Sequence, residues 1–206
     1  MERKVQTVLP FVSNIKNSIW KVTLEEVLFP AFFVFVILLS NLALISFPNV
    51  KFFDFFVFSA GYILGFRRGA IVAMVSWYIY GYANPWGPAS FGLLTTLMLS
   101  EVIYAAAGAV CRKQIKKGRV VFKVSDSRLY CFWAAIICTT TYDLLTNIHT
   151  GLIWADLAGS EQDIYWISVS VFGPGALMFY MVHLLSNVFL FSTLGPVLVS
   201  RFTKSS

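Results

Sequence analysis

The sequence predicts an all-α membrane protein, a bundle of six transmembrane helices. Two features of composition support this: 58% of the 206 residues are hydrophobic and only 13% are charged, and the mean hydropathy is +0.73. Soluble proteins carry about 25% charged residues, and their folded surface is too large for so apolar a chain. A crossing takes about 20 residues, so six crossings with their loops use the whole length. No room is left for a soluble catalytic or ATPase domain.

Six apolar segments are predicted to cross the bilayer, and together they place one transmembrane domain over residues 24–200. They are residues 24–47, 52–66, 69–82, 89–110, 128–148 and 167–200; the second and third are short, and the last is long enough to tilt or break. Residues 1–23 mix apolar side chains with charges and contain no cleavable signal peptide, which predicts an amphipathic helix at the cytoplasmic interface. Residues 201–206 are predicted to form a cytoplasmic tail.

The charges predict the orientation. If the N-terminus is cytoplasmic, every basic residue except Lys51 falls in a cytoplasmic segment, and Asp156, Glu161 and Asp163 fall in the last outer loop. This is the positive-inside pattern, and it requires an even number of crossings with both termini in the cytoplasm. It also accounts for the net charge of +6 without nucleic-acid binding, which would need a basic groove with stacking aromatics. We expect a multi-pass protein of a prokaryotic plasma membrane.

The outer loops are rich in aromatic residues, Asn, Pro and Gly. Tyr80 and Trp86 flank Asn84, Trp77 lies one turn before Tyr80, and Trp154 belongs to the last outer loop, residues 149–168. Such residues form aromatic belts at the lipid interface. A rigid loop with aromatic faces and polar tips over the mouth of a bundle would also suit a planar organic ligand.

The fifth segment carries a polar face, because Thr139, Asp143 and Asn147 recur every four residues. Tyr142 extends this surface. Ionisable side chains inside a membrane usually face the bundle interior or a cavity. Asp143 is therefore expected either to contact a ligand or to bind hydroxyl groups of neighbouring helices.

The sixth segment repeats the pattern with Tyr180, His183 and Asn187 on one face. His183 has three interpretations: a hydrogen-bonded core residue, a ligand contact or a metal ligand. Metal binding is disfavoured because the chain has only two His, and its three Cys lack paired ligand spacing. Glu101 is expected to pair with His183 or a hydroxyl, or to face a cytoplasmic partner. Asn41 is expected to reach a ligand or another helix.

Small residues gather in the expected cytoplasmic half, including Gly61 and Gly65 four apart, followed by Gly69 and Ala73. They predict close helix packing within the chain or a groove for a partner's helices. The sequence contains no nucleotide-binding glycine motif and no GxSxG motif, so neither an energy source nor an enzyme is expected. No cofactor is expected either.

Residues 58–88 (FSAGYILGFRRGAIVAMVSWYIYGYANPWGP) and 141–151 (TYDLLTNIHTG), with the compact six-span layout, resemble the S component of energy-coupling factor vitamin transporters. The resemblance implies capture of a vitamin-like molecule by the outer loops, and partnership with a transmembrane coupling subunit and two ATPase subunits. It implies that Tyr80, Asn84, Trp86, Asp143, Asn147 and the neighbourhood of Trp154 bind the ligand. With the polar residues above, the expected site comprises Asn41, Trp77, Tyr80, Asn84, Trp86, Tyr142, Asp143, Asn147, Trp154, Tyr180 and His183.

One feature departs from that family. Many members carry an Ala-x-x-x-Ala face on the first span, whereas this segment has only Ala31 and Ala43. Docking of a coupling subunit would then use another surface, such as that around Gly69 and Ala73. Two other functions remain open: a small membrane enzyme acting on a lipid-linked substrate, with Asp143, His183 or Glu101 as acid or base, and a structural subunit without a ligand.

Overall fold

A computed structural model describes residues 24–85, 87–116 and 124–203, and these form helices and short connections without a strand. Four helical stretches are long and apolar enough to cross a membrane: Glu26–Ala43, Phe91–Ile115, Asp126–Leu157 and Pro174–Phe202. The chain is therefore an all-helical protein of the membrane type. The predicted interfacial helix, residues 1–23, lies outside the described residues.

The helices follow the predicted segments in order. A π-helical turn, η1 (Leu24–Leu28), leads into α2 (Phe29–Ala43), and α3 (Phe53–Leu64), α4 (Phe66–Ala83), α5 (Phe91–Lys116), α6 (Val124–Leu157), α7 (Asp163–Phe172) and α8 (Pro174–Thr203) follow. The 12 residues of α3 span about 18 Å at 1.5 Å per residue. This is shorter than the roughly 30 Å hydrocarbon core of a bilayer.

Two boundaries differ from the prediction. Residues 149–157, expected in an outer loop, continue α6 to the turn at Gly159, whose φ is +59°. No proline interrupts them, and Gly151 stays helical where α6 packs closely on Ile167 of α7. The last segment divides at Gly173 into α7 and α8. Pro174 explains this break, since proline disfavours the helical conformation of the residue before it and begins a helix well.

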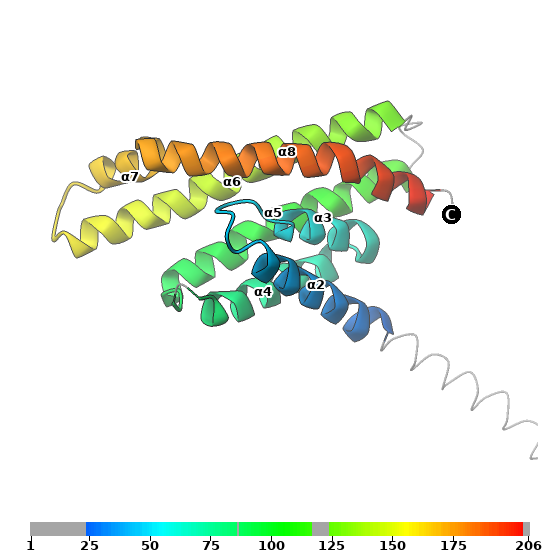
Figure 1. Cartoon of the computed structure of the whole chain (residues 1–206), viewed down its shortest axis with the longest axis horizontal. Helices are drawn as coiled ribbons and strands as arrows, with labels where there is room; N and C mark the ends of the chain where they lie inside the picture. Colours follow the sequence, from blue (N-terminus) through cyan, green and yellow to red (C-terminus); the bar gives the residue numbers. More distant parts are fainter. Residues whose placement is uncertain (1–23, 86, 117–123, 204–206) are drawn as a thin grey trace, which may run out of the picture.

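Successive long helices run in opposite directions. The ring of Phe53, at the start of α3, lies 4.9 Å from that of Trp77 in the second half of α4. Tyr104 of α5 donates a hydrogen bond to Thr139 of α6. Figure 1 shows α6 and α8 side by side along their length with α7 at one tip, and α5 contacts α3, α4 and α6. The shared core lies among α3, α5, α6 and α8.

Small residues bring α3, α4 and α5 into close contact. A Cβ atom at Gly61 would collide with the backbone of Ala105, one at Gly108 with the backbone of Phe58, and one at Gly69 with Gly61. These residues are thus used for packing within the chain. Gly69 and Ala73, around which a docking surface was expected, are both buried, so any partner would meet exposed neighbours on α4 such as Ile71 and Val75.

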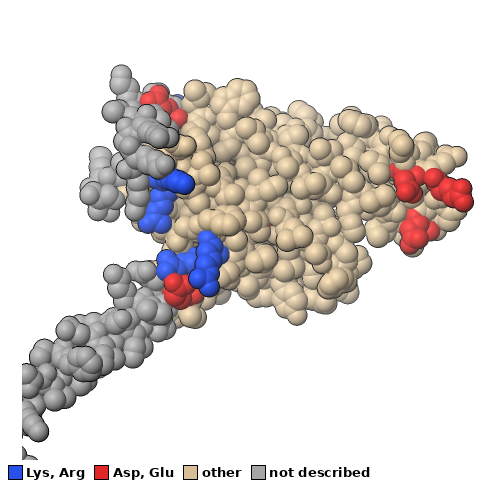
Figure 2. All heavy atoms as spheres, turned by 180° about the vertical axis from the view of Figure 1, so that it is seen from behind, with Lys and Arg blue, Asp and Glu red and all other residues tan. Residues whose placement is uncertain are grey.

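Basic side chains gather at one end of the molecule. Figure 2 shows Lys and Arg at that end with a few acidic side chains among them, and a group of acidic side chains without basic ones at the tip of α6 and α7. We call them the basic end, with Arg67, Arg112, Arg128 and Arg201, and the acidic end, with Asp156, Glu161 and Asp163. Between them, α2 exposes an apolar stripe suited to contact with acyl chains, formed by Phe32, Phe35, Leu39 and Leu42.

Candidate functional site

A cavity of about 500 Å³ opens in the half of the bundle nearer the acidic end. Its walls come from α4, the start of α5, the second half of α6, α7, the start of α8 and the α2–α3 linker, residues 44–52. Seven of the eleven expected site residues line it: Trp77, Tyr142, Asp143, Asn147, Trp154, Tyr180 and His183. The polar faces predicted for the fifth and sixth segments therefore converge on one chamber.

The base of this cavity is a carboxylate–imidazole–carboxylate contact. Nδ1 of His183 lies 3.0 Å from both carboxylate oxygens of Asp143, and Nε2 lies 2.6 Å from Oδ2 of Asp54. A neutral imidazole donates from one nitrogen only, so a doubly protonated ring is the form that satisfies both carboxylates. His183 thus links α3, α6 and α8 at a single point.

Asp54 is the main residue that sequence reasoning missed. It was given no role within the second segment, whereas the structure places it in the first turn of α3 with 2% of its surface exposed. Four phenylalanines surround it in the sequence FFDFF. A carboxylate inside so apolar a run is the signal that would have indicated a buried functional or structural group.

A layer of hydrogen bonds lies beneath the histidine. Asn187 donates from Nδ2 to Asp54 at 2.7 Å, to Thr139 at 2.9 Å and to Tyr104 at 3.2 Å. All four side chains are buried. The network joins α3, α5, α6 and α8, and it holds the floor of the cavity in one arrangement.

Trp77 forms an aromatic wall with a buried acid behind it. Its indole nitrogen donates to Oε2 of Glu101 at 3.0 Å, and its ring stacks on that of Tyr142 with centroids 6.4 Å apart. Glu101 is fully buried. Glu101 was expected to pair with His183 or with a hydroxyl group, and this was wrong. Its partner is Trp77, whose ring it orients.

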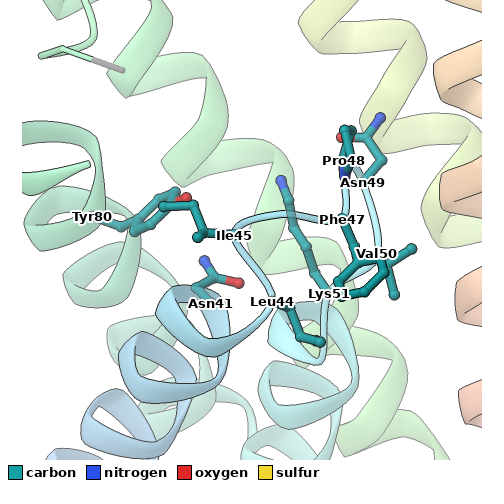
Figure 3. A pocket seen from close by; sticks show the side chains of 9 residues that line it. All are labelled: Asn41, Leu44, Ile45, Phe47, Pro48, Asn49, Val50, Lys51 and Tyr80. Carbon is teal, nitrogen blue, oxygen red and sulfur yellow. The ribbon is translucent and has the colours of Figure 1, made fainter. Parts of the chain in front are cut away.

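A second cavity of about 290 Å³ lies under the α2–α3 linker (Figure 3). Asn41 and Tyr80, two further expected residues, line this space and not the larger one. Asn49 and Lys51 of the linker line both cavities. The ammonium group of Lys51 lies 5.3 Å from the ring centroid of Trp77, a cation–π contact between the two spaces.

Two expected residues are not placed in either cavity. Asn84 shapes the turn after α4, since its side-chain amide donates to the carbonyl oxygens of Gly81 at 3.2 Å and Gly87 at 2.8 Å. Its observed contacts are structural ones. Trp86 lies outside the described residues. Within the described ranges, no group of three or more ionisable or thiol side chains is arranged to hold a metal ion.

Comparison of the chain with known protein families, curated protein sequences and solved structures finds no match. The functional argument therefore depends on the geometry of this molecule. That geometry combines an aromatic cavity, a charged and hydrogen-bonded floor, and a linker that borders two spaces.

Proposed function

We propose that this protein is a capture subunit, of the S component type, that binds a vitamin-like small molecule for uptake by partner subunits. The observation that carries the proposal is the chamber of about 500 Å³ on which seven expected residues converge. Its volume lies within the range of about 300–1,000 Å³ typical of small-molecule sites. A chain serving only as a structural subunit would have no need of such a space.

The lining suits an aromatic molecule with polar substituents. Trp154 is 42% exposed and offers a ring face, and stacking adds about 0.5–1.5 kcal/mol per aromatic pair beyond simple burial. Trp77 and Tyr142, which stack on each other and are buried, add apolar lining. Asp143 and Asn147 offer hydrogen-bonding groups along one side of α6. Rings would supply affinity, and the polar groups would orient the ligand and reject molecules that leave them unpaired.

The separation of charge supports the proposed orientation. With the basic end in the cytoplasm, six crossings place both termini inside and the cavity in the outer half of a prokaryotic plasma membrane. The short α3 and α4 meet at the Gly65 turn on the basic end and form the second and third crossings. A coupling subunit and two ATPase subunits would supply the energy that this chain does not encode.

The state of His183 favours capture over acid–base catalysis. Both of its ring nitrogens contact carboxylates, so neither is free to exchange a proton with a substrate in the cavity. Its contacts tie helices together at the floor. Asp143 is the member of the group with more solvent access, its side chain being 14% exposed against 4% for His183.

The test is mass spectrometry of small molecules released from gently purified protein, with Asp143→Asn compared with the parent. This variant keeps the shape of the side chain and removes the charge. We expect a defined small molecule in the parent and at least about a tenfold loss of it in Asp143→Asn. Glu161→Gln is the control, because this exposed acid lies at the acidic end and lines neither cavity.

Two results would contradict the proposal. One is a parent protein that carries no small molecule and is not stabilised by any vitamin in a thermal screen. The other is equal retention by Asp143→Asn and Glu161→Gln. Turnover of a lipid-linked substrate by the purified chain alone would instead indicate the membrane enzyme.

A further inference from the structure

We infer that the second cavity, under the α2–α3 linker, is a subsite for a carboxylate group of the captured molecule. The inference rests on the proposed capture function and adds the chemical class of the ligand. Four polar side chains line the space: Asn41 from α2, Asn49 and Lys51 from the linker, and Tyr80 from α4 (Figure 3). Aliphatic and aromatic side chains form the rest of the lining.

Asn41 is the residue that points to a ligand. Only 4% of its surface is exposed, yet within the described part of the chain neither its amide nitrogen nor its oxygen has a hydrogen-bond partner. Buried polar groups in proteins are nearly always paired, so an orphaned amide that lines a cavity calls for a partner inside it. In Asn187 the oxygen is also unpaired among the described residues, but the amide nitrogen, by contrast, bonds to neighbouring helices.

The charge of the lining selects the class of partner. Lys51 contributes a positive charge, and the described residues bordering this cavity include no acid. The Asn41 amide, the Lys51 ammonium and the Tyr80 hydroxyl all donate hydrogen bonds, and donors around a cation suit a carboxylate. No polar contact joins Asn41, Lys51 and Tyr80 to one another.

The position of Lys51 joins the subsite to the main chamber. Its ammonium group lies over the ring of Trp77, which lines the larger cavity, and its side chain borders both spaces. A molecule with an aromatic ring beside Trp77 and an acidic arm would therefore extend from one space into the other past Lys51. The linker is held to α8 by Asn49, which donates to the carbonyl oxygen of Phe179 at 3.1 Å.

The first experiment uses acetate as the probe and the side-chain amide of Asn41 as the reporter. The full chain is labelled with ¹⁵N-asparagine in detergent, and the Asn41 signals are assigned by their loss in Asn41→Leu. We expect acetate to shift them saturably, and acetamide, which is neutral and similar in shape, to bind at least about tenfold more weakly. Lys51→Met should weaken acetate binding by about tenfold or more, whereas Lys113→Met, at the basic end, should leave it unchanged.

The second experiment measures the stability of Asn41→Leu. Leucine has the branching of asparagine and removes two unpaired buried polar atoms, and the adjacent cavity can take its larger volume. We therefore expect the midpoint of thermal unfolding without ligand to rise by about 2–8 °C. A fall in the midpoint would show that the amide serves the fold, and would overturn the inference. So would the absence of a saturable acetate shift, or equal binding of acetate and acetamide.

The outcomes separate this inference from the capture proposal. If the purified protein carries a small molecule with no acidic group, capture stands and the carboxylate subsite is wrong. If acetate binds at Asn41 but no small molecule is retained, the subsite stands as an anion site and capture is wrong. If the parent protein retains a small molecule that has a carboxylate, and Lys51→Met no longer retains it, both the capture proposal and the carboxylate subsite are supported.

Discussion

Nε2 of His183 in α8 lies 2.6 Å from Oδ2 of Asp54 in α3, although the two residues are 129 positions apart in the sequence. Both side chains are almost fully buried, with 4% and 3% of their surface exposed. Ring contacts of Phe191 with Phe55 and Phe58 also join these helices, although α3 packs chiefly on α5 and α8 chiefly on α6. The pair thus ties two halves of the bundle together directly below the cavity.

Replacing Asp54 with alanine should destabilise the protein strongly. The change leaves His183 without one of its carboxylates and Asn187 without one of its acceptors. Breaking a buried ion pair from one side costs about 3–5 kcal/mol, so we expect the free energy of unfolding to fall by about that amount. Asp54→Asn, which keeps the shape and an acceptor oxygen, should cost less.

Unfolding of purified protein in detergent, followed by circular dichroism, measures this effect. Asp156→Ala is the matched control, because Asp156 is exposed at the end of α6. An exposed acid should change stability by no more than about 0.5 kcal/mol. Equal stability of Asp54→Ala and Asp156→Ala would show that the buried pair contributes nothing.

Trp77→Phe should destabilise the protein through Glu101 while keeping an aromatic wall. The indole nitrogen is the partner of Oε2, and Oε1 of Glu101 already lacks one among the described residues. A buried acid left without a partner costs about 1–3 kcal/mol. The same unfolding measurement should show this loss in Trp77→Phe and not in Trp133→Phe, whose tryptophan is 52% exposed.

A double variant isolates the pair. In Glu101→Leu the buried acid is gone, so adding Trp77→Phe should cost less than it does alone. Equal costs in the two backgrounds would show that the hydrogen bond between Trp77 and Glu101 does not contribute to stability. Trp77 would then act only through its ring contacts with Phe53 and Tyr142.

Gly61→Ala should destabilise the contact of α3 with α5. The added methyl group would meet the backbone of Ala105, which cannot move away as a flexible side chain could. Overpacking of this kind costs about 1–3 kcal/mol. Gly175→Ala is the control, because a Cβ atom there meets nothing within 4 Å. If Gly61→Ala and Gly175→Ala unfold at the same temperature, the helices are not as close as described.

Much of the fold follows from patterns of residue type that act locally. Apolar runs and their lengths predicted every long helix, and the charges predicted the separation of a basic from an acidic end. The extension of α6 through Trp154 was missed, because Gly151 and the aromatic and polar residues around it suggested a loop, whereas the structure keeps this glycine in the helix against α7. The length of the last segment suggested a break but not its position, which depends on Pro174.

The site was predictable where it lies on one helix face, and not where it depends on contacts between helices. Asp143 and Asn147 share a face by spacing alone, and the structure brings both to the chamber. The partners of His183 could not be predicted from the sequence, because Asp54 and Asp143 belong to two other helices. Asn41 and Tyr80 line a different cavity from Trp77 because of the path of the α2–α3 linker, and no periodic pattern in the sequence predicts that path.

Cysteine labelling in cells should test the six crossings. Cys111, Cys131 and Cys138 are buried, with 0%, 0% and 3% of their surface exposed, so the parent gives little background. Glu161 is exposed just after the end of α6, at the acidic end of the molecule, and Lys113 is exposed in the last turn of α5, at the basic end. We expect a membrane-impermeant maleimide to label Glu161→Cys in intact cells, and Lys113→Cys only after permeabilisation, since basic segments stay in the cytoplasm.

Arg67→Cys extends the test to the short helices. Arg67 is exposed beside the Gly65 turn, where α3 and α4 meet. Four crossings and six crossings both place the two termini on the same side of the membrane. They differ in the Gly65 turn, which is cytoplasmic if α3 and α4 cross, and is not if both enter and leave on the outer face. Labelling of Arg67→Cys only after permeabilisation supports six crossings. Labelling in intact cells, with Lys113→Cys protected, would instead show that α3 and α4 enter and leave on the outer face, and would contradict the six crossings.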